Sequence, residues 1–222
     1  MKKKVLNIVC IVILAVASVV AVFFAVTAVR FLWARPLTIR SISMEPTLKN
    51  GSLHYADATA KPKVGDMVVF FYSESGLGED LPSPAYYGAN AFLRCMPIWG
   101  SSIPADYGEG YMLLVKRMVA TGGDTVELRK VVENEVEFVY LYRNGVRVEE
   151  DIVMFDKDAV NQATRDYAET LDQSKVAAVK PTEPYTVPEG AVYVLGDNRD
   201  NSADSRDFGA VDEAMVVAVV HK

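Results

Sequence analysis

Residues 63–72, KVGDMVVFFY, decide the fold of this 222-residue chain. Gly65 and Asp66 indicate a turn, and the apolar and aromatic run after them is typical of a buried strand. Similar short runs recur along the chain between Gly, Pro, Asn and Asp, and Asn144-Gly145 between two of them is the strongest short-range signal for a β-hairpin. The further predicted strands are 52–59, 111–120, 136–142, 146–150, 191–195 and 215–220.

Two long stretches interrupt this β pattern. Residues 73–110 are rich in Gly, Pro, Ser and Tyr, and residues 151–190 hold a proline-punctuated segment and one predicted helix near 158–173. Ordered loops of such length are uncommon and often functional, so we expect both stretches to be insertions on a β scaffold. The apolar residues within 92–99 predict contact with a membrane or a substrate, and core packing is the alternative.

The N-terminal segment predicts a membrane anchor. Residues 5–29 carry no charge and are almost entirely apolar. At about 1.5 Å per residue, such a helix exceeds the ~30 Å hydrocarbon core of a bilayer. A cleaved signal peptide is the alternative, but its apolar region spans only about 7–15 residues, so the length favours a retained transmembrane helix. Three lysines at residues 2–4 favour a cytoplasmic N-terminus and an extracytoplasmic remainder.

Charge and rare residues exclude several classes of function. The chain has 23 basic and 29 acidic residues, and without the three N-terminal lysines the balance is 20 against 29, or −9. A surface this acidic repels phosphate backbones, so we expect no nucleic acid partner. Cys10 and Cys95 cannot build a disulfide framework, and His54 and His221 leave no zinc-binding pattern.

Ser43 and Lys116 are the first two candidates for chemistry. Ser43 precedes the stiff turn that Pro46 predicts, although by itself this segment indicates no more than a polar turn. Lys116 shares a strand face with Leu114 and Met118. If that face is buried, desolvation lowers the pKa of the amine from about 10.4 towards neutrality and creates a general base. The alternative is an edge-strand lysine whose charge discourages aggregation.

The third candidate segment is the polar run 196–206, GDNRDNSADSR. Its composition is typical of a solvated acidic loop or a calcium-binding loop, although the EF-hand spacing fails. Ion pairs between its own acids and arginines are a further alternative. A serine nucleophile needs an adjacent base, and His54 and His221 are poorly placed for that role. A Ser–Lys dyad is therefore the favoured nucleophilic arrangement.

In this order and behind an anchor, these segments resemble the bacterial type I signal peptidase family. The matching boxes are SISMEPT at 41–47, GDMVVF at 65–70, VKR at 115–117 followed by Gly123-Asp124, and the segment 196–206. Each box is short, but four of them in sequence behind an anchor are specific. The chain departs from the family where Thr121-Gly122 stands in place of the usual proline before Gly-Asp, which predicts a looser turn.

The resemblance implies roles for individual residues. Ser43 would be the nucleophile and Lys116 its general base, while the backbone N–H of Ser43 and the hydroxyl of Ser41 would bind the oxyanion. The supporting residues would be Ser202, which orients the Lys116 amine, and the ion pairs Asp204–Arg206 and Asp197–Arg117. The family needs neither a cofactor nor a metal.

The resemblance also implies a mostly β fold: an N-terminal transmembrane helix, then an antiparallel β-sheet or barrel-like catalytic domain with a smaller inserted α+β region. Residues 1–30 would be the cytoplasmic tip and anchor. Residues 31–130 and 191–222 would form the catalytic core, with 73–110 as an insertion loop. Residues 131–190 would form the inserted region with a hairpin and the helix.

The implied activity is endoproteolytic removal of N-terminal signal peptides from exported pre-proteins, after small residues in an Ala-x-Ala pattern. Its partners would be signal peptides, the lipid bilayer and the secretion translocon, and its location the cell membrane. Two alternatives stay open: a relative dedicated to one co-secreted substrate, such as a pilin or a conjugation component, and a catalytically silent, membrane-anchored binding module. Intact Ser43 and Lys116 argue against the silent module.

Overall fold

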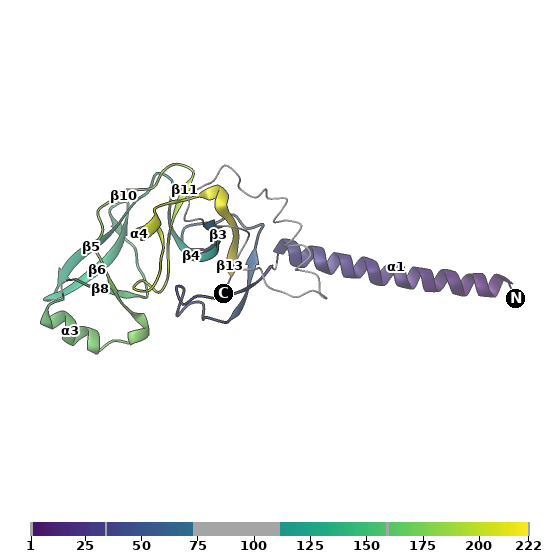
Figure 1. Cartoon of the computed structure of the whole chain (residues 1–222), viewed down its shortest axis with the longest axis horizontal. Helices are drawn as coiled ribbons and strands as arrows, with labels where there is room; N and C mark the ends of the chain where they lie inside the picture. Colours follow the sequence, from purple (N-terminus) through teal and green to yellow (C-terminus); the bar gives the residue numbers. More distant parts are fainter. Residues whose placement is uncertain (1, 34, 73–111, 159, 222) are drawn as a thin grey trace.

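The structure, a computed structural model, describes residues 2–33, 35–72, 112–158 and 160–221. The predicted insertion loop 73–110 lies outside the described residues, and so does the apolar cluster within 92–99. A long helix extends away from a β part that is built from two sheets (Figure 1). The mostly β fold with an N-terminal apolar helix is thus confirmed.

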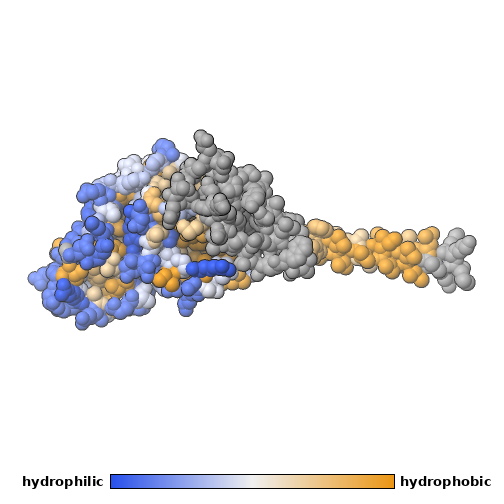
Figure 2. All heavy atoms as spheres, in the orientation of Figure 1, coloured by the Kyte–Doolittle hydropathy of each residue, from blue (hydrophilic) through white to orange (hydrophobic). Residues whose placement is uncertain are grey.

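The N-terminal helix α1 (Lys2–Trp33) is long and apolar enough to cross a membrane over Leu6–Val29. Within this span Thr27 is buried and Phe23 is partly exposed, whereas the other residues are exposed. Figure 2 shows the described part of the helix as a continuous hydrophobic rod, whereas hydrophilic residues dominate the face of the β part farthest from it. A helix that is apolar on all sides and exposed over most of its length needs an apolar solvent, which a bilayer supplies.

Seven strands form the first sheet, and every pairing in it is antiparallel. Among the described strands the sheet has two free ends, β1 and β12, so it is open rather than closed into a barrel. In spatial order, its strands are β1 (Arg35–Thr38), β2 (Leu53–Asp57), β13 (Val216–His221), β3 (Met67–Tyr72), β4 (Met112–Thr121), β11 (Ala191–Leu195) and β12 (Val211–Asp212).

The second sheet lies at the end of the β part that is far from α1 (Figure 1). Its pairings are antiparallel except that β8 and β9 run parallel. Its strands are β10 (Tyr185–Thr186), β5 (Thr125–Glu133), β6 (Val136–Arg143), β8 (Val153–Asp156) and β9 (Val176–Val179), with β7 (Val146–Arg147) paired to β6. The domain boundaries at 131 and 190 stay a prediction.

The position of strand β3 in the fold explains why its residues are apolar or aromatic throughout. Its side chains alternate between two clusters of buried residues: Met67 and Val69 belong to one, and Val68 and Phe70 to the other. Successive side chains of a strand point to opposite faces, so both faces of this central strand are buried. The strand predicted from this run is confirmed, with the same bounds.

Strand β4 leads into β5 and so connects the two sheets. The turn between them is closed by a bond from the Asp124 N–H to the Thr121 carbonyl, 3.0 Å, and the Asp124 carboxylate accepts the Thr121 N–H at 3.0 Å. Gly123 has a φ of +83°, which a glycine adopts without strain. The looser turn predicted from the missing proline is therefore wrong, because the aspartate closes the turn from both sides.

The predicted helix near 158–173 is shorter in the structure. Helix α3 covers only Gln162–Glu169, and a 3₁₀ turn, η1 (Gln173–Lys175), follows it. Asn161 is the N-cap that fixes where the helix begins, because its side chain accepts the Thr164 N–H. The remaining short elements are α4 (Ser205–Phe208) and the 3₁₀ turn η2 (Glu213–Met215).

The Thr164 side chain fixes α3 to β6. It is fully buried, and its hydroxyl oxygen accepts the Glu137 N–H at 2.8 Å. Thr164→Val keeps the shape but leaves that N–H without an acceptor, so it should lower the free energy of unfolding by about 1–3 kcal/mol. Thr164→Ser keeps the acceptor and should cost about 1 kcal/mol or less. Urea unfolding of the detergent-solubilised chain, followed by circular dichroism, compares the two; a valine variant as stable as wild type would contradict this role.

Candidate active site

Three segments of the first sheet and its loops bring the predicted site residues together. Ser41 and Ser43 lie in the loop between β1 and β2, and Lys116 lies in the middle of β4. All three line one cavity of about 180 Å³. Apolar side chains make up much of its wall, among them Leu37, Ile39, Met44, Leu113 and Val115.

Lys116 is buried although it is charged in water. Its side chain lies beside Val68 of β3, its partner in the strand pairing, and the residue is only 3% exposed. Burial lowers the pKa of the amine to about 8, with a smaller contribution from the positive charge of Arg206, while Asp204 and Asp207 act in the opposite direction. The buried face on which the sequence argument depended is therefore present. The amine therefore loses its proton at a pH closer to neutrality than an exposed lysine does.

Ser202 is the hydrogen-bond partner of the buried amine. The Lys116 Nζ donates to the Ser202 Oγ at 3.0 Å. Ser202 comes from the loop after β11, 86 residues away in the chain. A fixed partner limits the rotamers of a long side chain, so this bond sets the direction in which the amine points.

The Ser41 hydroxyl and the Ser43 backbone meet at the edge of the cavity. The Ser43 N–H donates to the Ser41 Oγ at 3.2 Å. Ser43 itself is 8% exposed, and its carbonyl accepts the Asn198 N–H at 3.0 Å. The serine loop is thus fastened to the 196–206 loop through its backbone, which leaves the Ser43 hydroxyl free of that task.

Two of the ion pairs that hold the 196–206 loop are those of Asp204 and Asp197. Asp204 is fully buried, and Arg206 donates to its two carboxylate oxygens at 2.8 and 2.7 Å. Asp197 is paired in the same way with Arg117, at 2.7 and 2.5 Å. Burial raises the pKa of Asp204, but the hydrogen bonds that Arg206 donates and its positive charge hold this pKa below its ordinary value. The hydrogen bonds that Arg117 donates to Asp197 raise the pKa of Arg117. Of the alternatives for this segment, internal ion pairs describe its structure.

Gly196 lies where the serine loop and the two ends of the 196–206 loop approach one another. Its N–H donates to the buried Asp204 carboxylate at 2.9 Å. A methyl group at this position would lie 2.2 Å from the Ser202 Oγ and 2.5 Å from the Ser43 carbonyl oxygen. Only a glycine allows both neighbours to approach this closely.

Sequence reasoning gave no role to Asn198 and Arg199. The Asn198 side chain donates to the Ile42 carbonyl at 3.1 Å, one residue before the serine. Arg199 is 2% exposed, and its guanidinium contacts the distant Glu150. No local pattern could identify this contact, because its two partners are 49 residues apart and belong to segments on different sheets. Of the nine buried polar or charged side chains among the described residues, six belong to the site, namely Ser43, Lys116, Asp197, Arg199, Asp204 and Ser205.

Comparison with known proteins places this chain in a family of peptidases. The family described as signal peptidase, peptidase S26, matches residues 11–221. Signal peptidase I of Mycobacterium tuberculosis is 30% identical over 205 residues, which cover 87% of this chain and 60% of that protein. The chloroplastic thylakoidal processing peptidase 1 of Arabidopsis thaliana is 31% identical over 196 residues, covering 85% of this chain and 42% of that protein. This chain therefore spans about half the length of these two relatives.

A solved structure, signal peptidase I from Enterococcus faecalis V583, aligns with a TM-score of 0.36 and 24% identity. The alignment covers 73% of this chain and 98% of that chain.

The lowered pKa of Lys116 has a consequence for stability. Between pH 8 and the ordinary lysine value of 10.5, the unfolded chain binds a proton that the folded chain has released, so stability rises with pH in that window. Below pH 8 both states are protonated and the cost of the buried ammonium is complete. Lys116→Met removes that cost and should stabilise the fold at pH 7 by at most about 3 kcal/mol, at 1.36 kcal/mol per pKa unit.

Denaturant unfolding at pH 7 and at pH 10.5 measures this effect. The advantage of Lys116→Met should shrink at the higher pH, since the wild-type amine is then neutral in the folded chain and about half neutral in the unfolded chain. Lys63→Met is the matched control, because Lys63 is exposed in the turn before β3. A methionine variant less stable than wild type at pH 7 would contradict a destabilising buried amine.

Proposed function

The chain belongs to the signal peptidase family, peptidase S26, and from this premise we propose that it is a Ser–Lys endopeptidase that removes signal peptides from exported pre-proteins. The observation that carries the proposal is a buried lysine amine with a pKa of about 8 in the same small cavity as Ser43. A serine hydroxyl needs a neutral base beside it, and at neutral to alkaline pH this amine is such a base. The proposal includes neither a metal nor a cofactor.

In the proposed reaction, the Ser43 Oγ attacks the carbonyl carbon of the scissile peptide bond and its proton passes to the Lys116 Nζ. Lys116 then protonates the leaving amine as the peptide C–N bond breaks, which leaves an ester on Ser43. Lys116 then takes a proton from a water molecule that attacks this ester, and it returns the proton to the Ser43 Oγ as the ester C–O bond breaks, which releases the acid product and regenerates the enzyme. Ser202 positions the amine through both steps, since its hydroxyl accepts a hydrogen bond from the Nζ at 3.0 Å.

The oxyanion of each tetrahedral intermediate would be bound by the Ser43 N–H and the Ser41 hydroxyl. These two groups now bond each other at 3.2 Å, a long hydrogen bond that a developing negative charge can replace. Such a donor contributes on the order of 10²–10³ in rate. The Asp204–Arg206 and Asp197–Arg117 pairs would support the site by fixing the loop that carries Ser202.

The anchor fits this substrate class. Leu37, the first residue of the cavity wall, follows the end of α1 at Trp33 by four residues. Four residues of extended chain span at most about 14 Å, so the cavity wall starts close to the membrane surface if α1 spans the bilayer. We place the N-terminus in the cytoplasm and the catalytic part outside it, where signal peptides emerge from the bilayer and, by our proposal, from the translocon.

Cleavage of a defined pre-protein tests the function. Wild type and the variants Ser43→Ala and Lys116→Ala, all in detergent, are incubated with a pre-protein that carries an Ala-x-Ala site, and the new N-terminus is sequenced. We expect wild type alone to cut after the second Ala, with a loss of at least about 10³ in rate for either variant. Lys116→Arg should not restore activity, because the guanidinium stays protonated.

Lys63→Ala is the control for loss of an unrelated lysine and should cleave like wild type. Cleavage by Ser43→Ala at the wild-type rate would contradict the role of Ser43 as the nucleophile. The absence of cleavage by folded wild type would contradict the activity of a general signal peptidase.

The pH dependence of cleavage follows from the Lys116 amine. Only the neutral amine accepts a proton, so kcat/KM should rise about tenfold per pH unit below pH 8 and level off above it. The expected curve is measured with a peptide substrate that has no group titrating between pH 6 and 10. A rate that is constant across this range would contradict a lysine base.

A further inference from the structure

The buried Arg199 makes more contacts than any role in the proposed reaction requires. Its guanidinium donates from Nη1 to the Glu150 Oε2 at 2.7 Å and from Nη2 to the Glu150 Oε1 at 2.5 Å. The Nε donates to the Gly196 carbonyl at 2.9 Å, and Nη1 also lies 3.7 Å from the Met154 sulfur. The side chain is 1% exposed and that of Glu150 is 13% exposed, so this is a buried, bidentate ion pair.

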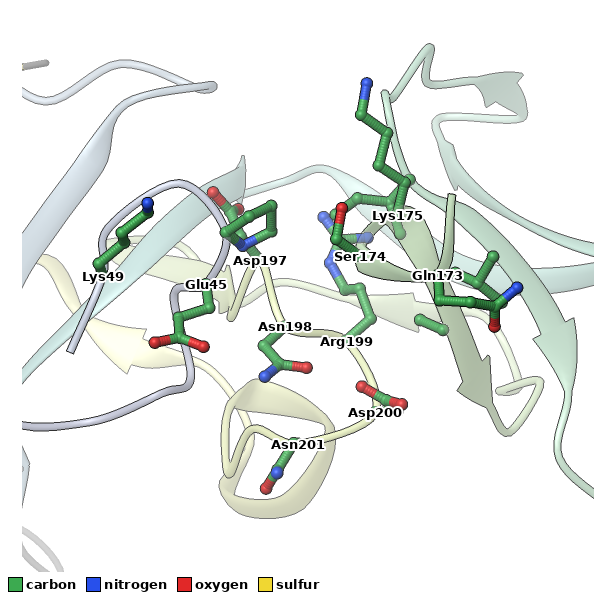
Figure 3. Close-up of a pocket in the computed structure, with 14 residues that line it drawn as sticks. Glu45, Lys49, Gln173, Ser174, Lys175, Asp197, Asn198, Arg199, Asp200 and Asn201 are labelled. Atoms are coloured by element: carbon green, nitrogen blue, oxygen red, sulfur yellow. The ribbon is translucent and has the colours of Figure 1, made fainter. Parts of the chain in front are cut away.

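Glu150 belongs to the segment between β7 and β8 of the second sheet. The pair therefore joins the second sheet to the loop of the first sheet that carries Ser202. It lies beside a cavity of about 590 Å³, which Asn198, Arg199, Asp200 and residues 173–177 help to line (Figure 3). Asn198 and Arg199 are neighbours, yet their side chains leave the loop on opposite sides (Figure 3). Asn198 bonds the serine loop, and Arg199 bonds the second sheet.

Arg199 acts on the Lys116 amine indirectly: it holds Gly196, and Gly196 packs against Ser202, which bonds the amine. Its Nε fixes the carbonyl of Gly196, the residue that a methyl group would push into Ser202 and Ser43. The Arg199 carbonyl oxygen accepts a hydrogen bond from the Arg206 Nη1 at 2.6 Å. Arg206 also donates to the Asp204 carboxylate, and this carboxylate accepts the Gly196 N–H. Both peptide groups that flank the Cα of Gly196 are thus held through Arg199, directly on one side and through Arg206 and Asp204 on the other.

We infer that the Glu150–Arg199 pair positions the 196–206 loop, which carries Ser202. The second sheet then contributes to the geometry of the active site through Glu150. Glu150 and Arg199 do not line the cavity of Ser43 and Lys116. They act through Gly196 and Ser202, which makes them positioning residues. This inference rests on the proposed function for its kinetic readout, but its structural readout does not need activity.

Glu150→Gln is the test, because it removes the charge and one of two oxygen acceptors while keeping the length of the side chain. Glu149→Gln is the matched control: it removes the same charge one residue earlier, where the side chain is 87% exposed and lies 3.9 Å from Arg147. The full chain is studied in detergent, and its fold is verified by circular dichroism. Hydrogen exchange of peptides covering residues 195–206 measures how often the loop opens. The kcat, the KM and the pH profile of cleavage measure how well the Lys116 amine is placed and at which pH it loses its proton.

We expect exchange in residues 195–206 to increase at least about tenfold in Glu150→Gln and not in Glu149→Gln. The kcat should fall about tenfold to hundredfold with KM within about twofold, since a misplaced base affects the chemical step and not the cavity wall. The midpoint of the pH profile should move up, because a loosened loop admits water to Lys116. The charged groups that act on this amine are Asp204, Arg206 and Asp207, and none of them is changed by the variant.

Wild-type exchange, kcat and pH midpoint in a folded Glu150→Gln would overturn the inference. If Glu150→Gln does not fold, Arg199→Lys replaces it, because lysine keeps the buried charge but cannot reach Glu150 and Gly196 together. Unfolding of both variants would also overturn the inference, since the pair would then stabilise the fold as a whole. If wild type cleaves no substrate, the proposed function fails, and the exchange data alone decide whether the pair positions the loop.

Discussion

The burial of a single amine, that of Lys116, is the constraint on which the rest of the site depends. A buried ammonium without a partner is costly, and a carboxylate in contact would fix its proton and raise its pKa. In the structure the Lys116 amine has a partner, but this partner is a hydroxyl group and not a carboxylate. Asp204 is the acidic residue that raises the pKa of the amine most, but Arg206 binds both of its oxygens and its positive charge opposes this effect. The contact made by the amine is a hydroxyl, that of Ser202, which bonds it without adding charge.

This solution requires a rigid loop, and the structure provides one at considerable cost in buried charge. Asp197, Arg199 and Asp204 are all less than 6% exposed. Buried ion pairs add little net stability compared with apolar side chains of similar size, whereas loss of one partner is strongly destabilising. Such pairs therefore make geometry specific more than they make folding favourable. The apolar strands β3 and β11, buried on both faces, supply the stability that the polar loop does not.

Short-range patterns in the sequence were enough to predict most of the first sheet and the apolar strand face on which Lys116 lies, but they left open whether that face is buried. Alternation along 111–120 placed the amine on an apolar face, and turn residues marked the ends of β3 and β6. Strand β5 was missed because the charged side chains of Glu127, Arg129 and Lys130 obscure the buried Val126 and Leu128. The Glu150–Arg199 pair could not be predicted by such reasoning, since it depends on how the second sheet packs against a loop 49 residues further along.

The anchor completes the physical argument for the proposed substrate. A signal peptide and α1 are both apolar segments that a bilayer confines, so enzyme and substrate meet in two dimensions at a high effective concentration. The cavity wall begins four residues after α1, which limits how far from the membrane a bound peptide can lie. A peptide that follows its own membrane-embedded segment by a few residues satisfies that limit, whereas a folded domain does not. Under the proposed function, selection of substrate would begin with position relative to the bilayer, before any side chain enters the cavity of Ser43 and Lys116.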